Sequence, residues 1–130
     1  MNFNKLFSMQ KELDSHIENN HQIQNENLFD KKILALLVEL GELANETRCF
    51  KFWSLKSPAP KEKIGEEYVD GLHFILSLGL ECGFEKEEIK ISTGQNKDIT
   101  GQFLEIYDQV NKFKNNPTYT NYEQLFNEFL

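Results

Sequence analysis

The sequence predicts an all-α fold, a helical bundle with one buried helix at its centre. Proline occurs only at positions 58, 60 and 117, so long stretches of the chain contain no helix-breaking residue. Apolar residues recur three and four positions apart, which is the spacing of one helix face, and strand-like alternation is missing. The segment GLHFILSLGL at 71–80 is apolar on nearly every side, which is typical of a helix surrounded by other helices.

The first half of the chain predicts two helices and two loops. The first helix runs from Phe3 to about Asn19, and a polar loop follows as far as Asn27. The second helix begins at Asp30, which we expect to be its N-cap, and runs to about Thr47. The segment RCFKFWSLKSPAP, with its aromatic cluster and two prolines, is then a loop.

The second half of the chain predicts four further helices. The third helix runs from Lys61 to about Cys82, with Gly83 as its C-cap, and is the buried one. A short fourth helix is expected over residues 85–91, and Asp98 caps a fifth. The sequence NNPT ends that helix, and a sixth starts near Thr120.

The last predicted helix places its most apolar residues at the end of the sequence, where no capping residue follows. We therefore expect residues 1–130 to be a single domain that lacks a further C-terminal segment. A chain of this length suffices for one ordinary core.

The net charge and the cysteine content exclude several classes of function. The formal net charge is −7, which does not suit a protein that reads a nucleic-acid backbone or an anionic membrane. Neither a signal peptide nor a membrane-spanning run is evident. The cysteines, Cys49 and Cys82, lie outside any CxxC motif, and we expect reduced thiols in a cytoplasmic protein.

Two acidic pairs interrupt the most apolar helices. Glu39 and Glu42 are three positions apart, and so are Glu67 and Asp70, so each pair shares one helix face. If the two helices pack antiparallel, four carboxylates meet. At about 4 Å, two like charges repel by roughly 1 to 4 kcal/mol, and a divalent cation with a preference for oxygen ligands would remove that cost. The pairs therefore predict a site for Mg²⁺, or Mn²⁺, that handles phosphates; the alternative is two solvated acidic faces.

The pattern ELGE at 39–42, followed by EEYVD at 66–70, resembles the ExxE…ExxD motif of MazG-like all-α nucleoside triphosphate pyrophosphatases. The segments KKILALLVELGELANETRCFKFWS and EEYVDGLHFILSLGLECGF resemble the dimeric all-α dUTPases more closely. This resemblance covers residues 6–84 well and the C-terminal third loosely.

The resemblance implies a homodimer that hydrolyses dUTP, and as an alternative dUDP, to dUMP with Mg²⁺. It implies that Glu39, Glu42, Glu67 and Asp70 hold the metal, that Glu39 and Glu42 are catalytic, and that Glu42 activates the attacking water. The substrate-binding residues implied are Gln10, Asp14, His73 and Trp53 for the nucleoside, and Lys51 and Lys56 for the phosphates.

Several of these roles have alternatives. Asp14 stands where the family has an amide, so the base could instead be that of dCTP or of a damaged nucleotide. Trp53 could simply anchor its loop, and His73 could be a core histidine bonded to the backbone. A further alternative is a phage-type protein that binds a regulatory protein partner, with catalysis secondary.

Overall fold

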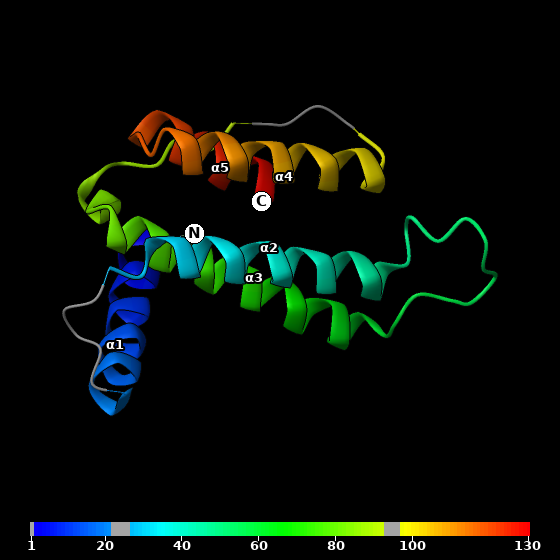
Figure 1. Ribbon diagram of the computed structural model, residues 1–130, viewed down its shortest axis with the longest axis horizontal. Coiled ribbons are helices and arrows are strands. Elements are labelled where there is room, and N and C mark those ends of the chain that lie inside the picture. Colours follow the sequence, from blue (N-terminus) through cyan, green and yellow to red (C-terminus); the bar gives the residue numbers. More distant parts are fainter. Residues whose placement is uncertain (1, 22–26, 93–96) are drawn as a thin grey trace.

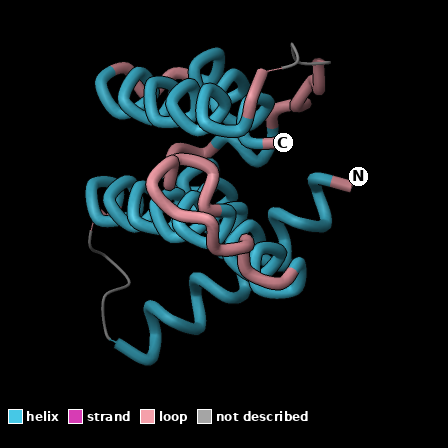
Figure 2. The backbone as a smooth tube through the Cα atoms, turned by 90° about the vertical axis from the view of Figure 1, so that its right-hand side faces the viewer, coloured by secondary structure: helices cyan, strands magenta, loops and turns pink. Residues whose placement is uncertain are grey.

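The computed structural model describes residues 2–21, 27–92 and 97–130. In these ranges the chain forms five α-helices and one 3₁₀ turn and no strand (Figures 1 and 2). The helices are α1 (Phe3–His21), α2 (Phe29–Thr47), α3 (Lys61–Glu81), α4 (Ile99–Asn115) and α5 (Tyr119–Phe129), and the turn η1 is Phe84–Lys86. None of the helices in the described ranges is both long and apolar enough to span a lipid bilayer.

The helices form two antiparallel pairs and one crossing helix. Helices α2 and α3 run antiparallel beside one another, α4 and α5 form a second pair over them, and α1 packs across α3 (Figures 1 and 2). The core between the pairs contains Ile33, Leu36, Leu40, Ile106, Val110, Phe113, Leu125 and Phe126. The all-α prediction is confirmed.

Helix α3 is the buried central helix that the sequence predicts. Every residue from Ile75 to Gly79 is buried, because α3 is covered on several sides by other helices. The fully buried ring of Tyr122 from α5 lies against it, and the Tyr122 hydroxyl donates a hydrogen bond of 2.8 Å to the carbonyl oxygen of Ile75. A Cβ atom at Gly79 would overlap that hydroxyl, so only glycine allows this close approach of the two helices.

One predicted helix start differs from the structure, and one agrees. Asp30 is not the N-cap of α2: the helix begins at Phe29, and the carboxamide of Asn27 accepts a hydrogen bond from the Phe29 amide instead. Asp30 lies in the first turn, where a negative charge favours the helix dipole. Asp98 does cap α4, since its carboxylate accepts a hydrogen bond from the Gly101 amide.

The end of α3 also differs from the prediction. The helix stops at Glu81, Cys82 is its C-cap, and Gly83 follows in the left-handed conformation with φ of 76°. The helix expected at 85–91 is wrong: only a 3₁₀ turn forms. The backbone amides of Lys90 and Ser92 donate instead to side chains of α5, at 2.9 and 2.8 Å, so they are not available for helical hydrogen bonds.

Both cysteines are free thiols, as the sequence predicts.

Candidate active site

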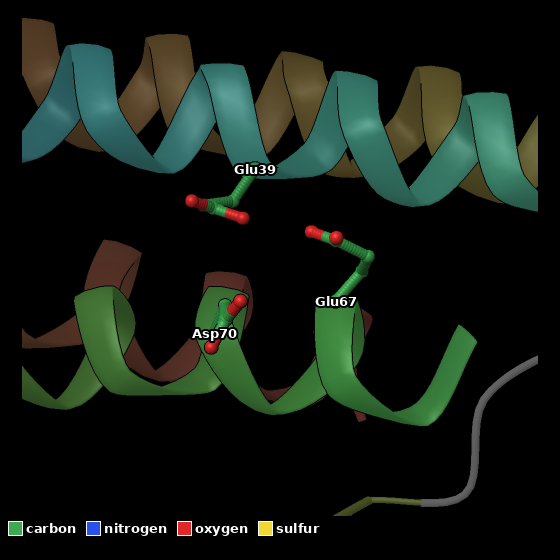
Figure 3. A group of neighbouring side chains, drawn as sticks. All are labelled: Glu39, Glu67 and Asp70. Carbon is green, nitrogen blue, oxygen red and sulfur yellow. The ribbon is translucent and has the colours of Figure 1, made fainter. Parts of the chain in front are cut away.

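Three carboxylates meet between α2 and α3. Glu39 comes from the middle of α2, and Glu67 and Asp70 come from the second and third turns of α3. One oxygen from each lies within 4.8 Å of the others, and Figure 3 shows Glu39 and Glu67 pointing toward one another across the gap between the helices. The antiparallel packing produces this meeting, because it sets the middle of α2 opposite the first half of α3.

The three acids differ in their exposure to solvent. Glu67 is buried, Glu39 is half-buried and Asp70 is exposed. Oε2 of Glu39 and Oε2 of Glu67 are both buried without a hydrogen-bond partner in the protein. Lys63 forms an ion pair with Glu67: its Nζ lies 3.4 Å from Oε1 of Glu67, and Oε2 has no partner. Buried carboxylate oxygens without partners are costly, and a cation bound between them would remove that cost.

The crowding of negative charge is visible in Glu39. Burial raises the pKa of its carboxyl group to about 7, and the neighbouring Glu42, Glu67 and Asp70 contribute to the same shift. Without a cation, Glu39 therefore holds a proton for part of the time near neutral pH. Metal binding has to displace that proton, so the affinity for a metal should rise with pH.

The donor set fits a divalent cation that prefers oxygen ligands. Three carboxylates within reach of one point, two of them with unpaired buried oxygens, match the ligands that Mg²⁺ takes in proteins.

A pocket of about 270 Å³ opens beside the acids. Glu39 and Asp70 form part of its wall, and Gln10, Asp14 and His73, three of the nucleoside-binding residues predicted from the sequence, form another part. The remaining lining residues are Leu13, Ile17, Phe74 and Ser77. The structure thus brings three of the four predicted metal ligands together, and two of them, Glu39 and Asp70, share a pocket with Gln10, Asp14 and His73.

A sequence model of the dUTPase family matches residues 2–130. The chain belongs to the all-α dUTPase family. No curated protein and no solved structure matches the chain. Membership of the dUTPase family makes the protein a dUTP diphosphatase, an enzyme that hydrolyses dUTP.

Glu42 is placed less directly in this dUTPase than the other three acids. It is exposed, and it lies outside the group of three carboxylates that share one point. Its charge nevertheless acts on Glu39, one turn earlier on α2, and helps to raise the pKa of that carboxyl group. Its role in water activation stays a prediction.

The structure does not bring the loop residues to the pocket. Trp53, Lys51 and Lys56 belong to the connection between α2 and α3, which extends beyond the ends of both helices (Figure 1), and none of them lines the pocket. Trp53 is 64 % exposed and packs edge-on against Phe52, with ring centres 5.1 Å apart. In this arrangement Trp53 contacts its own loop, so a base contact would require the loop to move.

Two residues of the site were missed by the sequence reasoning. Lys63 lies four residues before Glu67, a spacing that predicts an ion pair on a helix. Ser77 lines the pocket and donates a hydrogen bond of 2.7 Å to Oδ2 of Asp14, but its position on an apolar helix gave no signal of this.

Proposed function

We propose that this dUTPase hydrolyses dUTP to dUMP and pyrophosphate in a Mg²⁺-dependent reaction between α2 and α3. One observation carries the proposal: Glu39 and Asp70 belong both to the carboxylate group and to the wall of the adjoining pocket. A nucleotide whose phosphates lie at the carboxylates would therefore have its nucleoside in the pocket.

The acids have two roles in this reaction. Glu39, Glu67 and Asp70 would hold the metal, with Glu42 at the exposed edge. A Mg²⁺ ion held there would supply positive charge to offset the charge of the triphosphate. As the oxygen of the attacking water bonds to phosphorus, Glu42 accepts the proton that the water loses. The bond between that phosphorus and the bridging oxygen on its opposite side breaks, and pyrophosphate leaves. Fixing water and phosphate in line provides much of the rate enhancement.

Lys63 has a role that depends on the same ligands. Its ammonium group lies on Glu67, and the Lys63 pKa is raised by that contact. A metal ion on Glu67 would displace Lys63, whose side chain is 48 % exposed and free to turn toward the phosphates. Lys63 is thus a better placed phosphate contact than Lys51 or Lys56.

A homodimer is the assembly that we propose. Exposed apolar side chains recur four residues apart on two helices: Leu13 and Ile17 on α1, and Leu34 and Val38 on α2. Leu13 and Ile17 also line the pocket, so a second copy packed against them would border the nucleotide site. Light scattering coupled to size-exclusion chromatography measures the assembly directly, and a monomer at working concentration would contradict it.

A related enzyme activity, hydrolysis of dCTP, is the second candidate. The observation that favours it is Asp14, whose carboxylate can only accept hydrogen bonds. Cytosine has an exocyclic amine that donates hydrogen bonds, whereas uracil donates only from N3. The two candidates share the metal site and differ only in the base.

Pyrophosphate release from dUTP, dCTP, dTTP and UTP tests both candidates, with Mg²⁺ and with EDTA. We expect release from dUTP that requires Mg²⁺ and that falls by at least about 100-fold in Glu39→Gln and Glu42→Gln. Glu66→Gln is the matched control, because Glu66 is exposed on α3 next to Glu67 but outside the carboxylate group. Release that persists in EDTA, or an equal loss in Glu66→Gln, would contradict the proposal.

A further inference from the structure

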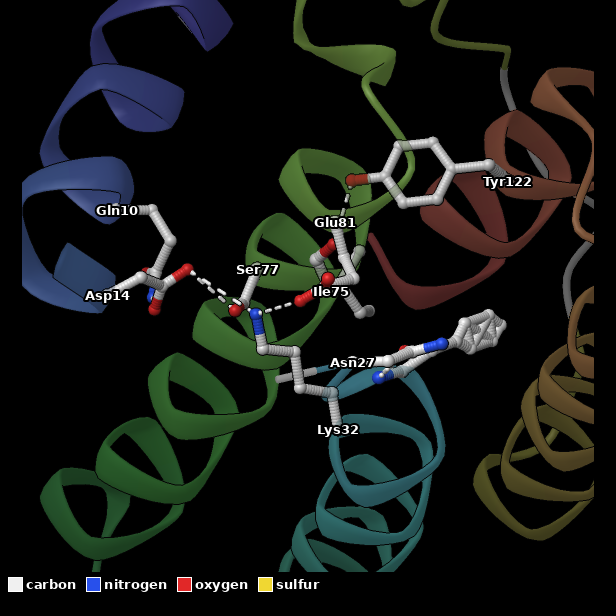
Figure 4. Close-up of polar contacts among 9 residues, drawn as sticks. Gln10, Asp14, Asn27, Lys32, Ile75, Ser77, Glu81 and Tyr122 are labelled. Atoms are coloured by element: carbon white, nitrogen blue, oxygen red, sulfur yellow. Dashed lines mark hydrogen bonds and ion pairs between the residues drawn. The ribbon is translucent and has the colours of Figure 1, made fainter. Parts of the chain in front are cut away.

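A second polar cluster adjoins the pocket and joins three helices (Figure 4). Asp14 of α1 accepts hydrogen bonds on both carboxylate oxygens, from Gln10 Nε2 at 2.9 Å and from Ser77 Oγ at 2.7 Å. Lys32 of α2 lies 4.0 Å from Oδ2 of Asp14, and it donates a 2.8 Å hydrogen bond to Glu81 on α3. Gln10 and Ser77 are 6 % and 3 % exposed, so the hydrogen bonds that they make are shielded from water.

Asp14 determines which way the Gln10 amide faces. A carboxylate accepts hydrogen bonds and cannot donate them, so only the NH₂ end of the Gln10 amide can point at it. The Gln10 oxygen is then left as an acceptor for a group in the pocket that Gln10 lines. An amide at position 14 could donate as well as accept, and it would allow the Gln10 amide to turn over.

Lys32 holds Asp14 from the side of α2. Its side chain is only 13 % exposed, and its ammonium group lies between two carboxylates, 4.0 Å from Asp14 and 2.8 Å from Glu81. Neither Lys32 nor Glu81 lines the pocket, so Lys32 can act on a bound base only through Asp14.

We propose that Asp14 and Lys32 are positioning residues that fix the orientation of the Gln10 amide and thereby select the base. The inference rests on the proposed function, because it takes the pocket to hold the base. A base that donates a hydrogen bond from its edge, as uracil does from N3, is bound by the fixed Gln10 oxygen. Cytosine carries a lone pair instead of a hydrogen on N3, so it would leave the fixed Gln10 oxygen unpaired at that position.

The test compares four variants by kcat/KM for dUTP divided by kcat/KM for dCTP. Asp14→Asn should lower this ratio about 10-fold, because the Gln10 amide is no longer fixed, and Lys32→Met should lower it as well. Lys32→Arg keeps the charge and should restore the ratio to within about twofold. Glu81→Gln is the matched control, because Glu81 shares the same ammonium group but does not reach the pocket. The effects should appear mainly as changes in KM for the two nucleotides.

A merely structural role would give a different pattern. Asp14→Asn and Lys32→Met would then lower the melting temperature while leaving the ratio as in wild type, or Glu81→Gln would change the ratio as much as Lys32→Met. Either result overturns the inference while the proposed dUTPase reaction stands. If Asp14→Asn does not fold, the pair of Lys32 variants decides the question.

The dissociation constants of dUMP and dCMP in EDTA separate the inference from the proposed function. If wild type binds dUMP but releases no pyrophosphate from dUTP, the proposed function fails, and the ratio of the two dissociation constants in the variants still decides the inference. If wild type binds neither nucleotide, the pocket is not a base site and the inference is overturned.

Discussion

Replacing Glu39 by glutamine should stabilise the metal-free protein. The oxygens of Glu39, Glu67 and Asp70 lie within 4.8 Å of one another. Two unit charges at that separation repel by about 1 kcal/mol in water and by about 3.5 kcal/mol at an effective dielectric constant of 20. Because Asp70 is exposed and Lys63 offsets the charge of Glu67, the lower end applies. We expect Glu39→Gln to raise the free energy of unfolding by about 1 kcal/mol at pH 8.

Thermal unfolding followed by circular dichroism in EDTA measures this effect. For a domain of this size, 1 kcal/mol corresponds to about 3 to 6 °C in the melting temperature. Mg²⁺ should reverse the order of the two proteins: it stabilises wild type by mass action and stabilises Glu39→Gln much less. A melting temperature in EDTA that is unchanged or lowered in Glu39→Gln, or raised equally in Glu66→Gln, would refute the reasoning.

The same variant should remove a pH dependence. The folded-state pKa of Glu39 is about 7, above its ordinary value of 4.5, so the folded protein binds this proton more tightly than the unfolded chain does. The resulting stability is full below pH 4.5 and is lost as pH rises to about 7. Metal-free wild type should therefore lose stability relative to Glu39→Gln between about pH 5 and pH 8. Parallel curves for the two proteins would contradict the raised pKa.

Three further predictions concern single side chains. Lys63→Met should tighten Mg²⁺ binding measured by calorimetry at pH 8, because no ammonium group then competes with the metal for Glu67. Lys61→Met should leave the affinity unchanged, and weaker binding in Lys63→Met would contradict the competition. Trp53→Ala should leave the melting temperature within about 1 °C, since the ring is largely exposed. It should raise KM for dUTP only if the loop closes over the base. A large loss of stability would show instead that this ring anchors the loop. Gly79→Ala should lower the free energy of unfolding, measured by chemical denaturation, by about 1 to 3 kcal/mol, because the added Cβ overlaps a buried tyrosine. Gly65→Ala on the same helix has nothing near the added Cβ and should raise that free energy by up to about 1 kcal/mol. Equal effects of the two substitutions would contradict the close approach at Gly79.

The sequence was sufficient for the fold class because helix periodicity and proline placement are local signals. The predicted helix at 85–91 failed because a distant element competed with the local pattern. The segment 85–91 has helix-forming residues, yet α5 supplies Glu123 and Asn127 as acceptors for its backbone amides. Such a partner lies more than 30 residues away and cannot be read from the segment itself.

The candidate site was predictable to the extent that it depends on helix faces. The i, i+3 spacing of the acids, together with antiparallel packing, accounts for the meeting of Glu39 with Glu67 and Asp70. Spacing does not show how far each helix is rotated about its axis. The position of Glu42 outside the group of the other three acids could therefore not be predicted. The position of Trp53 was equally beyond reach, because a loop without periodic contacts leaves no pattern from which to infer its path.

Two lysines show how a carboxylate that is paired inside the protein differs from one that is open to a cation from solvent. Lys32 is 13 % exposed and closes the contact with Asp14 from inside the protein, so nothing from solvent replaces it easily. The side chain of Lys63 is 48 % exposed and pairs with only one oxygen of Glu67. The second positive charge available to the three acids is a proton on Glu39, whose pKa is raised to about 7. A solvated lysine and a proton with a pKa near 7 are both released at little cost when a divalent cation arrives. This charge balance agrees with the metal site that we propose between α2 and α3.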